Sequence, residues 1–201
     1  FQLNTKNCTD LATLYTDAPP ISALDLSENG ALGCNLLRDF YIKTAYNCCA
    51  SGAFKNDYVN ICALATCIKQ GARCLDFEIY DVDGAPVIGV STVDSNHVKE
   101  CYNSVPFEEA MQYVADHAFS PGITACATDP LLLHFRIMSS HKEVYEQMAQ
   151  AIAKTLEPNG LLLGKKYSYE YNGHNAGTIP LRELAKKALI IVRKDGTLLQ
   201  N

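Results

Sequence analysis

Residues 73–80 read RCLDFEIY and residues 131–137 read LLLHFRI, and these two stretches decide the fold. Both have the apolar composition of buried strands, yet each carries two ionisable residues spaced two positions apart. These are Asp76 and Glu78 in the first stretch and His134 and Arg136 in the second. Because alternate residues of a strand leave the same face, each pair points to one side of the sheet. Ionisable groups facing inward on successive parallel strands are typical of the mouth of a (β/α) barrel, with solvated charges on an outer strand as the alternative.

The rest of the chain alternates expected strands with expected helices. We predict strands over residues 39–45, 73–80, 131–138 and 188–193, a short apolar stretch over 86–90, and helices over 56–70, 107–119, 141–156 and 181–187. Connections of this length between strands favour a parallel sheet with helices outside it. Such a sheet is either doubly wound and open or part of a barrel, and the inward-facing ionisable pairs favour the barrel.

Length and composition narrow the class of protein. A chain of 201 residues suits one domain or part of a larger one. With 48% hydrophobic and 19% charged residues, it can bury a substantial core and is not globally disordered. The net charge of −5 provides no basic surface, so no nucleic-acid partner is expected. No apolar run approaches the length of a membrane span.

The N-terminal residues and the nine cysteines indicate less about the structure than the strand pattern does. Residues 1–37 lack a sustained period and contain Pro19-Pro20, so we predict an extended arm or linker before an α/β barrel segment over residues 38–201. A disulfide between Cys8 and Cys34 is one pairing that the sequence permits. No Cys-x-x-Cys pair occurs, so a structural zinc site is not expected.

Several stretches carry a resemblance to a known family. They are GARCLDFEIYDVDGAPVIG (71–89), DPLLLHFRI (129–137) and PLRELAKKALIIV (180–192), together with YIKTAYNCC (41–49) and KNDYVN (55–60). The first three resemble the X region of phosphatidylinositol-specific phospholipase C. The last two, together with IKQG (68–71) and LDFEIY (75–80), look closer still to the phospholipase C-like proteins of large DNA viruses. The resemblance covers residues 37–194. It implies the first half of a TIM-like (β/α) barrel of the phospholipase C-like phosphodiesterase type.

The resemblance also implies a site, but the site is altered. Members of this family hydrolyse the phosphodiester of an inositol lipid with two histidines and a calcium ion. The match places Tyr46 and Val90 at the histidine positions, Asn47, Asp76 and Glu78 at calcium-ligand positions, and Arg136 at the last acidic ligand. A tyrosine, with an ordinary pKa of about 10, is a poor general acid or base at neutral pH.

An arginine at a ligand position conflicts with calcium, which binds six to eight oxygens and would be repelled by a guanidinium. We therefore predict that Arg136 pairs with Asp76 and Glu78 in place of the metal, and that the domain needs no metal or other cofactor. Calcium is expected only if this degenerate site still binds it. The leading hypothesis is a catalytically degenerate phospholipase C-like domain that acts as a structural or interaction protein.

Two other functions stay open at this stage. The first is an active, calcium-independent phosphodiesterase, because some bacterial members of the superfamily use an arginine in place of calcium. Arg136 would then replace the metal, and His134 and Tyr46 would be the other candidate catalytic residues. The second is a phosphoinositide headgroup-binding module formed by Asn47, Asp76, Glu78 and Arg136. The remaining histidines, His97, His117, His141 and His174, are expected at the surface.

The number of strands suggests that other protein covers the sheet. A complete TIM barrel has eight strands and roughly 250 residues, whereas we expect only four barrel strands here. An open half barrel exposes two strand edges. We therefore expect either a longer chain or partner subunits in an assembly, with a phosphoinositide lipid or membrane surface as a further partner. The viral resemblance favours a virion, capsid-associated or membrane-associated location.

Overall fold

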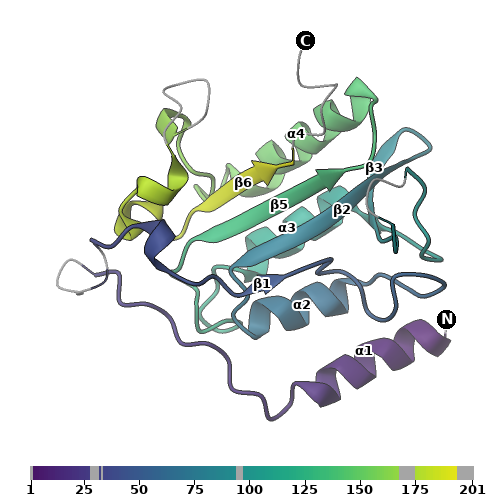
Figure 1. Ribbon diagram of the computed structural model, residues 1–201, viewed down its shortest axis with the longest axis horizontal. Coiled ribbons are helices and arrows are strands. Elements are labelled where there is room, and N and C mark those ends of the chain that lie inside the picture. Colours follow the sequence, from purple (N-terminus) through teal and green to yellow (C-terminus); the bar gives the residue numbers. More distant parts are fainter. Residues whose placement is uncertain (1, 28–31, 33, 94–96, 168–174, 194–201) are drawn as a thin grey trace.

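The computed structural model describes residues 2–27, 32, 34–93, 97–167 and 175–193, which form one mixed sheet with helices packed beside it (Figure 1). The strands are β1 (Thr44–Ala45), β2 (Cys74–Val82), β3 (Ala85–Gly89), β4 (Val105–Pro106), β5 (Leu131–Ile137) and β6 (Ala188–Val192). The helices are α1 (Gln2–Leu14), α2 (Ile61–Lys69), α3 (Phe107–His117) and α4 (Lys142–Leu156). Within the described ranges, none of the helices is long and apolar enough to cross a membrane.

The sheet has the order β4-β3-β2-β5-β6, with β1 also paired to β2. β1 pairs with the first residues of β2 and β3 with its last ones, so both lie along the same edge of β2. β1, β2, β5 and β6 run parallel, while β2 and β3 form an antiparallel hairpin. Over the described residues the sheet does not close on itself, and its four parallel strands are the four that the sequence predicted.

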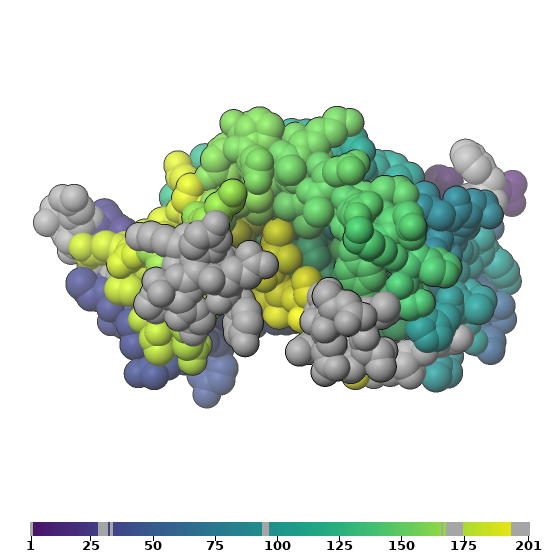
Figure 2. All heavy atoms as spheres, turned by 90° about the horizontal axis from the view of Figure 1, so that it is seen from above, coloured from purple at the N-terminus to yellow at the C-terminus, as the bar shows by residue number. Residues whose placement is uncertain are grey.

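The two faces of the sheet differ because the strands alternate. One face packs against the helices: Phe77 and Phe135 are fully buried, and the ring of Phe107 at the start of α3 lies 5.3 Å from that of Phe135. Residues of α2, α3 and α4 belong to the same core cluster. Figure 2 shows the α4 layer, in green, beside β6, in yellow. The opposite face carries the ionisable pairs, as the spacing in residues 73–80 and 131–137 indicated.

The predicted extended arm over residues 1–37 is wrong for its first part, because Gln2–Leu14 form helix α1. A disulfide joins Cys8 of this helix to Cys62 of α2, so the Cys8–Cys34 pairing is also wrong. Cys34 is instead an exposed free thiol. α1 contributes no buried residue, so it has no apolar stripe that a periodicity search could detect.

Several element boundaries also differ from the prediction. The strand expected over 39–45 is reduced to Thr44–Ala45, because Leu37–Asp39 form a 3-10 turn. The helix expected from residue 56 begins at Ile61, where Asn60 caps it by accepting the backbone N–H of Cys62. The apolar stretch over 86–90 proves to be β3. The helix expected over 181–187 is a single 3-10 turn, Leu181–Leu184.

β6 was predicted as a buried strand, and this is correct only for its first two residues. Ala188 and Leu189 are buried, whereas Ile190, Ile191 and Val192 are about 40% exposed. The reason is topological: among the described residues, β5 is the only strand beside β6, and on the other edge a single bridge to Leu162 covers Ala188 and leaves the later residues open. An apolar strand edge of this kind is a ready site for pairing with another strand.

Candidate functional site

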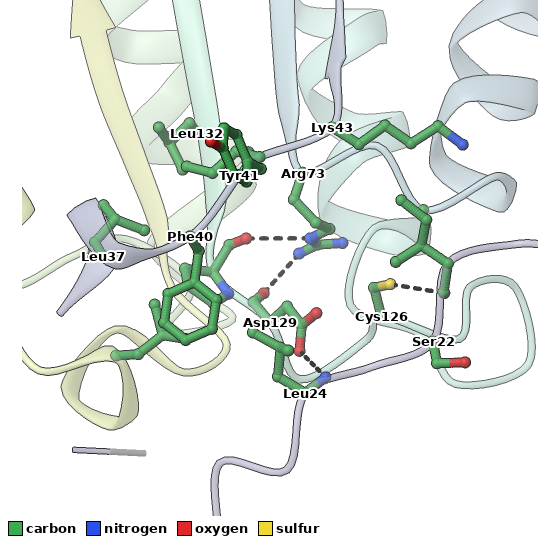
Figure 3. A pocket seen from close by; sticks show the side chains of 15 residues that line it. Ser22, Leu24, Leu37, Phe40, Tyr41, Lys43, Arg73, Cys126, Asp129 and Leu132 are labelled. Carbon is green, nitrogen blue, oxygen red and sulfur yellow. Dashed lines mark hydrogen bonds between the residues drawn. The ribbon is translucent and has the colours of Figure 1, made fainter. Parts of the chain in front are cut away.

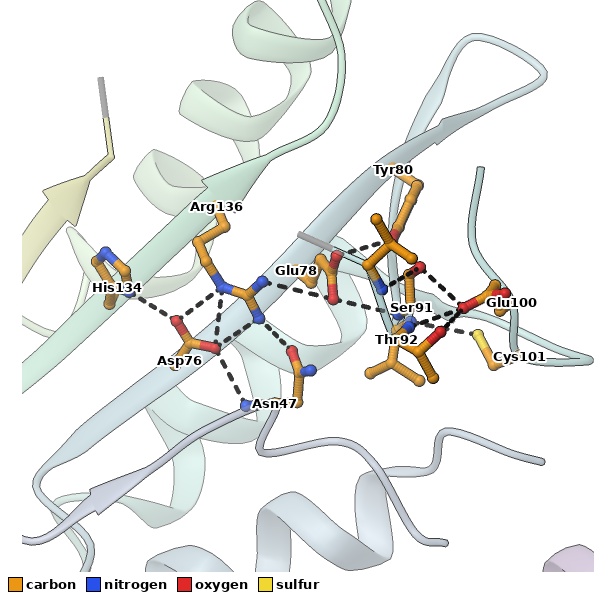
Figure 4. Close-up of polar contacts among 12 residues, drawn as sticks. Asn47, Asp76, Glu78, Tyr80, Ser91, Thr92, Glu100, Cys101, His134 and Arg136 are labelled. Atoms are coloured by element: carbon orange, nitrogen blue, oxygen red, sulfur yellow. Dashed lines mark hydrogen bonds and ion pairs between the residues drawn. The ribbon is translucent and has the colours of Figure 1, made fainter. Parts of the chain in front are cut away.

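Five polar residues come together on the face of the sheet opposite the helices (Figure 4). They are Asn47, Asp76, Glu78, His134 and Arg136. The register of β2 and β5 places Asp76 beside His134 and Glu78 beside Arg136. Asn47 follows β1 with a φ of 48°, a left-handed conformation that asparagine tolerates better than most residues. The structure thus brings together the acids and the arginine that strand alternation placed on one face.

Arg136 is the centre of this cluster. Its Nη2 lies 2.9 Å from Oδ1 of Asp76 and its Nε 3.1 Å from Oδ2, a two-pronged ion pair. Nη2 also donates to the side-chain oxygen of Asn47, and Nη1 lies 3.6 Å from Oε2 of Glu78. The Arg136 side chain is only 3% exposed. Burial acts to lower its pKa, but the two carboxylates outweigh burial and the pKa is raised, so the guanidinium stays charged.

Asp76 is held in its ionised form. Besides Arg136, its carboxylate accepts the backbone N–H of Asn47 at 3.1 Å and Nδ1 of His134 at 2.6 Å. Burial acts to raise the pKa of Asp76, but the hydrogen bonds from Arg136, Asn47 and His134 outweigh it and the pKa is lowered.

Glu78 lies in a different environment, although it is only two residues away. Its carboxylate accepts the hydroxyl of Tyr80 at 2.8 Å and the backbone N–H of Ser91 at 3.3 Å. Burial raises the pKa of Glu78, and the hydrogen bonds and Arg136 offset this only in part. Neither Tyr80 nor Ser91 was expected here. Tyr80 could have been found, because it follows Glu78 by two positions on β2, but nothing in the sequence signals that Ser91 returns to this strand.

His134 and Tyr46 lie at the exposed side of the cluster. The side chain of His134 is 29% exposed, so it is not packed in the core. Its Nδ1 faces the Asp76 carboxylate and so carries the proton, which leaves Nε2 as the lone-pair nitrogen of the neutral ring. The ring of Tyr46 stacks over the Arg136 guanidinium at 4.5 Å, with the ring of Phe54 5.9 Å away. Tyr46 therefore covers the guanidinium of Arg136.

The opposite shifts of the two acids predict how stability depends on pH. The folded pKa of Asp76 lies below its unfolded value of about 3.9, so its stabilisation is complete above that pH and is lost as the pH falls through the folded pKa. Glu78 has the opposite sign: its contribution is complete below about pH 4.3 and is lost as the pH rises through its raised pKa. Asp76→Asn should therefore flatten the acid limb of a plot of unfolding free energy against pH, measured by urea titration. An unchanged limb would contradict the prediction.

Calcium does not fit this site. Asn47, Asp76 and Glu78 are the three side chains that the resemblance gave as its ligands. Nη2 of Arg136 already occupies the oxygens of Asn47 and Asp76, and Nη1 lies beside Glu78. A divalent cation here would need these oxygens and would lie against a positive charge.

Comparison with known proteins gives no match to a family model or to a curated protein. Solved structures do match. PLC21 from S. officinalis is 25% identical with a TM-score of 0.63, and PLC21 from L. pealei is 22% identical with a TM-score of 0.60. Each comparison covers 86% of this chain and 20% of the other. A mutant of the phosphatidylinositol-specific phospholipase C from Staphylococcus aureus is 15% identical over 82% of this chain and 50% of that one, with a TM-score of 0.49.

The fold is that of the phospholipase C-like phosphodiesterases. The chain spans about a fifth of the length of the PLC21 chains it matches. The parallel strands β1, β2, β5 and β6 therefore form part of a phospholipase C-like barrel, as the sequence predicted. The closer likeness to viral proteins stays a prediction.

The other predicted positions in this phospholipase C-like fold do not join the cluster. Val90, at the second histidine position, is 1% exposed, and its backbone N–H donates to the thiol of Cys101. His97 and His141 are exposed, as expected, and His117 is half-buried and stacks on Tyr113. His174 lies outside the described residues.

A cavity of about 110 Å³ lies at the opposite, amino ends of the strands of this phospholipase C-like fold (Figure 3). Arg73 lines it, but its Nε, Nη1 and Nη2 all donate to backbone carbonyls, those of Pro130, Ala118 and Asp129. Burial lowers the pKa of Arg73 to about 10. The Asp129 side chain accepts the N–H of Leu24 and so fastens the N-terminal segment across the strand ends. This arrangement holds the structure together, because each guanidinium nitrogen of Arg73 donates to a backbone carbonyl.

Proposed function

We propose that this phospholipase C-like domain does not hydrolyse phosphodiesters and serves as a structural or interaction domain. The observation that carries the proposal is the position of Arg136, whose guanidinium is buried among Asn47, Asp76 and Glu78. An arginine so placed neutralises the acids that would otherwise bind a metal. Neither Tyr46 nor Val90 supplies a group that titrates near neutral pH.

An interaction role draws support from the open sheet. Ile190, Ile191 and Val192 expose about 40% of their surface along the outer edge of β6. An apolar strand edge favours pairing with further strands, which other subunits or a longer chain would supply. The virion or capsid association expected from the sequence belongs to this proposal as its most specific form, and a membrane-associated location is the other form.

The test is release of water-soluble inositol phosphate from phosphatidylinositol vesicles by the intact protein, with calcium and with chelator. We expect no turnover in either condition while circular dichroism shows a folded protein. Turnover that chelator abolishes would overturn the proposal and the conclusion that calcium does not fit. An active phospholipase C, assayed on the same vesicles, controls for substrate quality.

A second candidate function is a calcium-independent phosphodiesterase. The observation that favours it is the 2.6 Å contact between His134 Nδ1 and Asp76, with His134 29% exposed beside the Arg136 guanidinium. An oriented, accessible imidazole next to a cation could move a proton during phosphodiester cleavage. In this case turnover would persist in chelator, His134→Ala would abolish it, and His117→Ala, which alters a histidine outside the cluster, would retain it.

A third candidate, binding of a phosphoinositide headgroup, has less support. A phosphate needs accessible donors, whereas Arg136 is 3% exposed, is paired with Asp76 and is covered by Tyr46. The vesicle experiment addresses this candidate as well, because sedimentation of the protein with the vesicles reports binding without turnover.

A further inference from the structure

The outer edge of β6 is prepared for a parallel neighbour. Its first residue, Ala188, is already bridged to Leu162 in the parallel sense, whereas the N–H of Arg193 donates to a carbonyl of β5. Because the backbone groups of successive strand residues point to alternate edges, Ile190 and Val192 direct theirs outward, as Ala188 does. Over the described part of the chain, no strand lies beside these two residues.

The side chains along this edge are apolar. Figure 2 shows β6, in yellow, at the surface of the molecule. Ile190, Ile191 and Val192 are each about 40% exposed. Ile190 and Ile191 also line a groove of about 430 Å³, together with Leu162 and Tyr167. Aliphatic side chains next to outward-facing backbone groups suit another strand as the occupant.

The opposite edge of the four parallel strands, formed by β1, is open as well. The carbonyl of Lys43 accepts the N–H of Cys74 at 3.2 Å, so alternation directs the backbone groups of Thr44 outward. Thr44 is exposed, and within the described ranges β1 pairs with β2 alone. A groove of about 310 Å³ lies beside β1, and Leu11 and Tyr15 are among its lining residues.

Helix α1 also presents an uncovered surface next to the β1 edge. It contributes no buried residue, and Leu14 and the adjoining Tyr15 are 71% and 40% exposed. The Cys8–Cys62 disulfide nevertheless fixes α1 beside α2. A helix that is held in place without burying any side chain is explained if another protein packs against it.

A second copy of this chain fits both edges at once. A twofold axis parallel to the strands keeps all strands parallel and sets the β6 edge of each copy beside the β1 edge of the other. Four parallel strands from each copy make eight, the number at which side chains fill the interior of a barrel. One added strand, in contrast, would still leave an open edge. We propose that two copies of this chain close one eight-stranded parallel barrel across their β6 and β1 edges.

The concave face of the sheet supplies apolar side chains for the interior of this barrel. The register places Ile191 beside His134, and it aligns Leu189, Leu132 and Cys74 across three strands. These residues therefore share the face of the Arg136 cluster. Ile191 is 41% exposed, and Leu132 and Cys74 are half-buried. The second copy buries them. This inference rests on the proposed interaction role and names its partner.

The first test is sedimentation equilibrium of the intact, disulfide-bonded protein, for which we expect the mass of two 22.0 kDa chains. Ile190→Pro removes an outward N–H and spares the bonds to β5, and Ile191→Asn puts an amide on the concave face. Each should weaken association at least about 100-fold, because every dimer contains two such seams. Ile123→Asn is the matched control, since Ile123 is also 41% exposed but lines neither groove, and it should leave association unchanged.

Cysteine cross-linking tests which edges meet. All proteins carry Cys34→Ser, because Cys34 is an exposed thiol. We expect oxidation of a mixture of Thr44→Cys and Ile190→Cys variants to link the two chains, whereas neither variant should link to itself. Ile190→Cys chains that link to one another would show that β6 meets β6 and would overturn the proposal.

Two other results would also overturn it: the mass of a single chain at millimolar protein, or a dimer that neither Ile190→Pro nor Ile191→Asn weakens. Circular dichroism and melting curves verify that each variant is folded. The vesicle assay keeps this inference separate from the proposed function. A single chain without turnover would overturn the second copy alone, whereas a dimer that releases inositol phosphate would overturn the proposed function alone.

Discussion

Replacing Arg136 with alanine should lower the free energy of unfolding by about 3–5 kcal/mol, because removal of one partner leaves buried charges without compensation. Asp76 and Glu78 are 4% and 1% exposed, so water cannot replace the guanidinium. The measurement is urea unfolding at neutral pH, with the disulfide kept intact. This is the largest effect of a single side chain that we expect in the protein.

Two further variants separate the charge effect from lost packing. Arg136→Met combined with Asp76→Asn and Glu78→Gln should recover much of the loss, because a buried ion pair replaced by uncharged groups of similar volume is often close to neutral. Lys142→Ala removes an exposed ion pair with Glu146 and should change stability by less than about 1 kcal/mol. If Arg136→Ala were no more destabilising than Lys142→Ala, the guanidinium would not be the group that holds this face together.

Removing the Cys8–Cys62 disulfide is the second large effect that we expect. The two cysteines are 54 positions apart, and a cross-link over a loop of that length lowers the entropy of the unfolded chain by an equivalent of about 4 kcal/mol. Cys8→Ser combined with Cys62→Ser should lower the unfolding free energy by up to this amount. Cys34→Ser, at an exposed free thiol, is the matched control and should have little effect.

The same double variant should release α1 before the rest of the chain unfolds. α1 buries no side chain, and its polar contacts with the body include Asn7 to Asp57 at 2.7 Å and Asn60 to Asn4 at 3.1 Å. Hydrogen exchange should therefore become fast over Gln2–Leu14 and stay slow over β2 and β5. Slow exchange in α1 without the disulfide would show that these side-chain contacts hold the helix by themselves.

The face on which the central ionisable residues lie could be predicted because strand alternation is local. Asp76, Glu78 and Arg136 share a face as a direct consequence of their spacing within two strands. The prediction of a partial barrel followed from the inward-facing pairs on these strands, from the expected total of four barrel strands and from the family resemblance. Element ends were less predictable: Leu37–Asp39 turn instead of extending, because backbone contacts with a distant segment, such as Leu37 N–H to the carbonyl of Ile179, decide that stretch.

Sequence alone thus determined the class of fold, the face that carries the charges and the conflict between Arg136 and a metal. Tertiary structure decided which groups touch. The register of β2 and β5 sets His134 against Asp76, and the turn after β1 brings Asn47 to Arg136. The path of α1 joins Cys8 to Cys62. The physical reason is that alternation within a strand depends on neighbouring residues, whereas a contact between distant segments depends on how every intervening element packs.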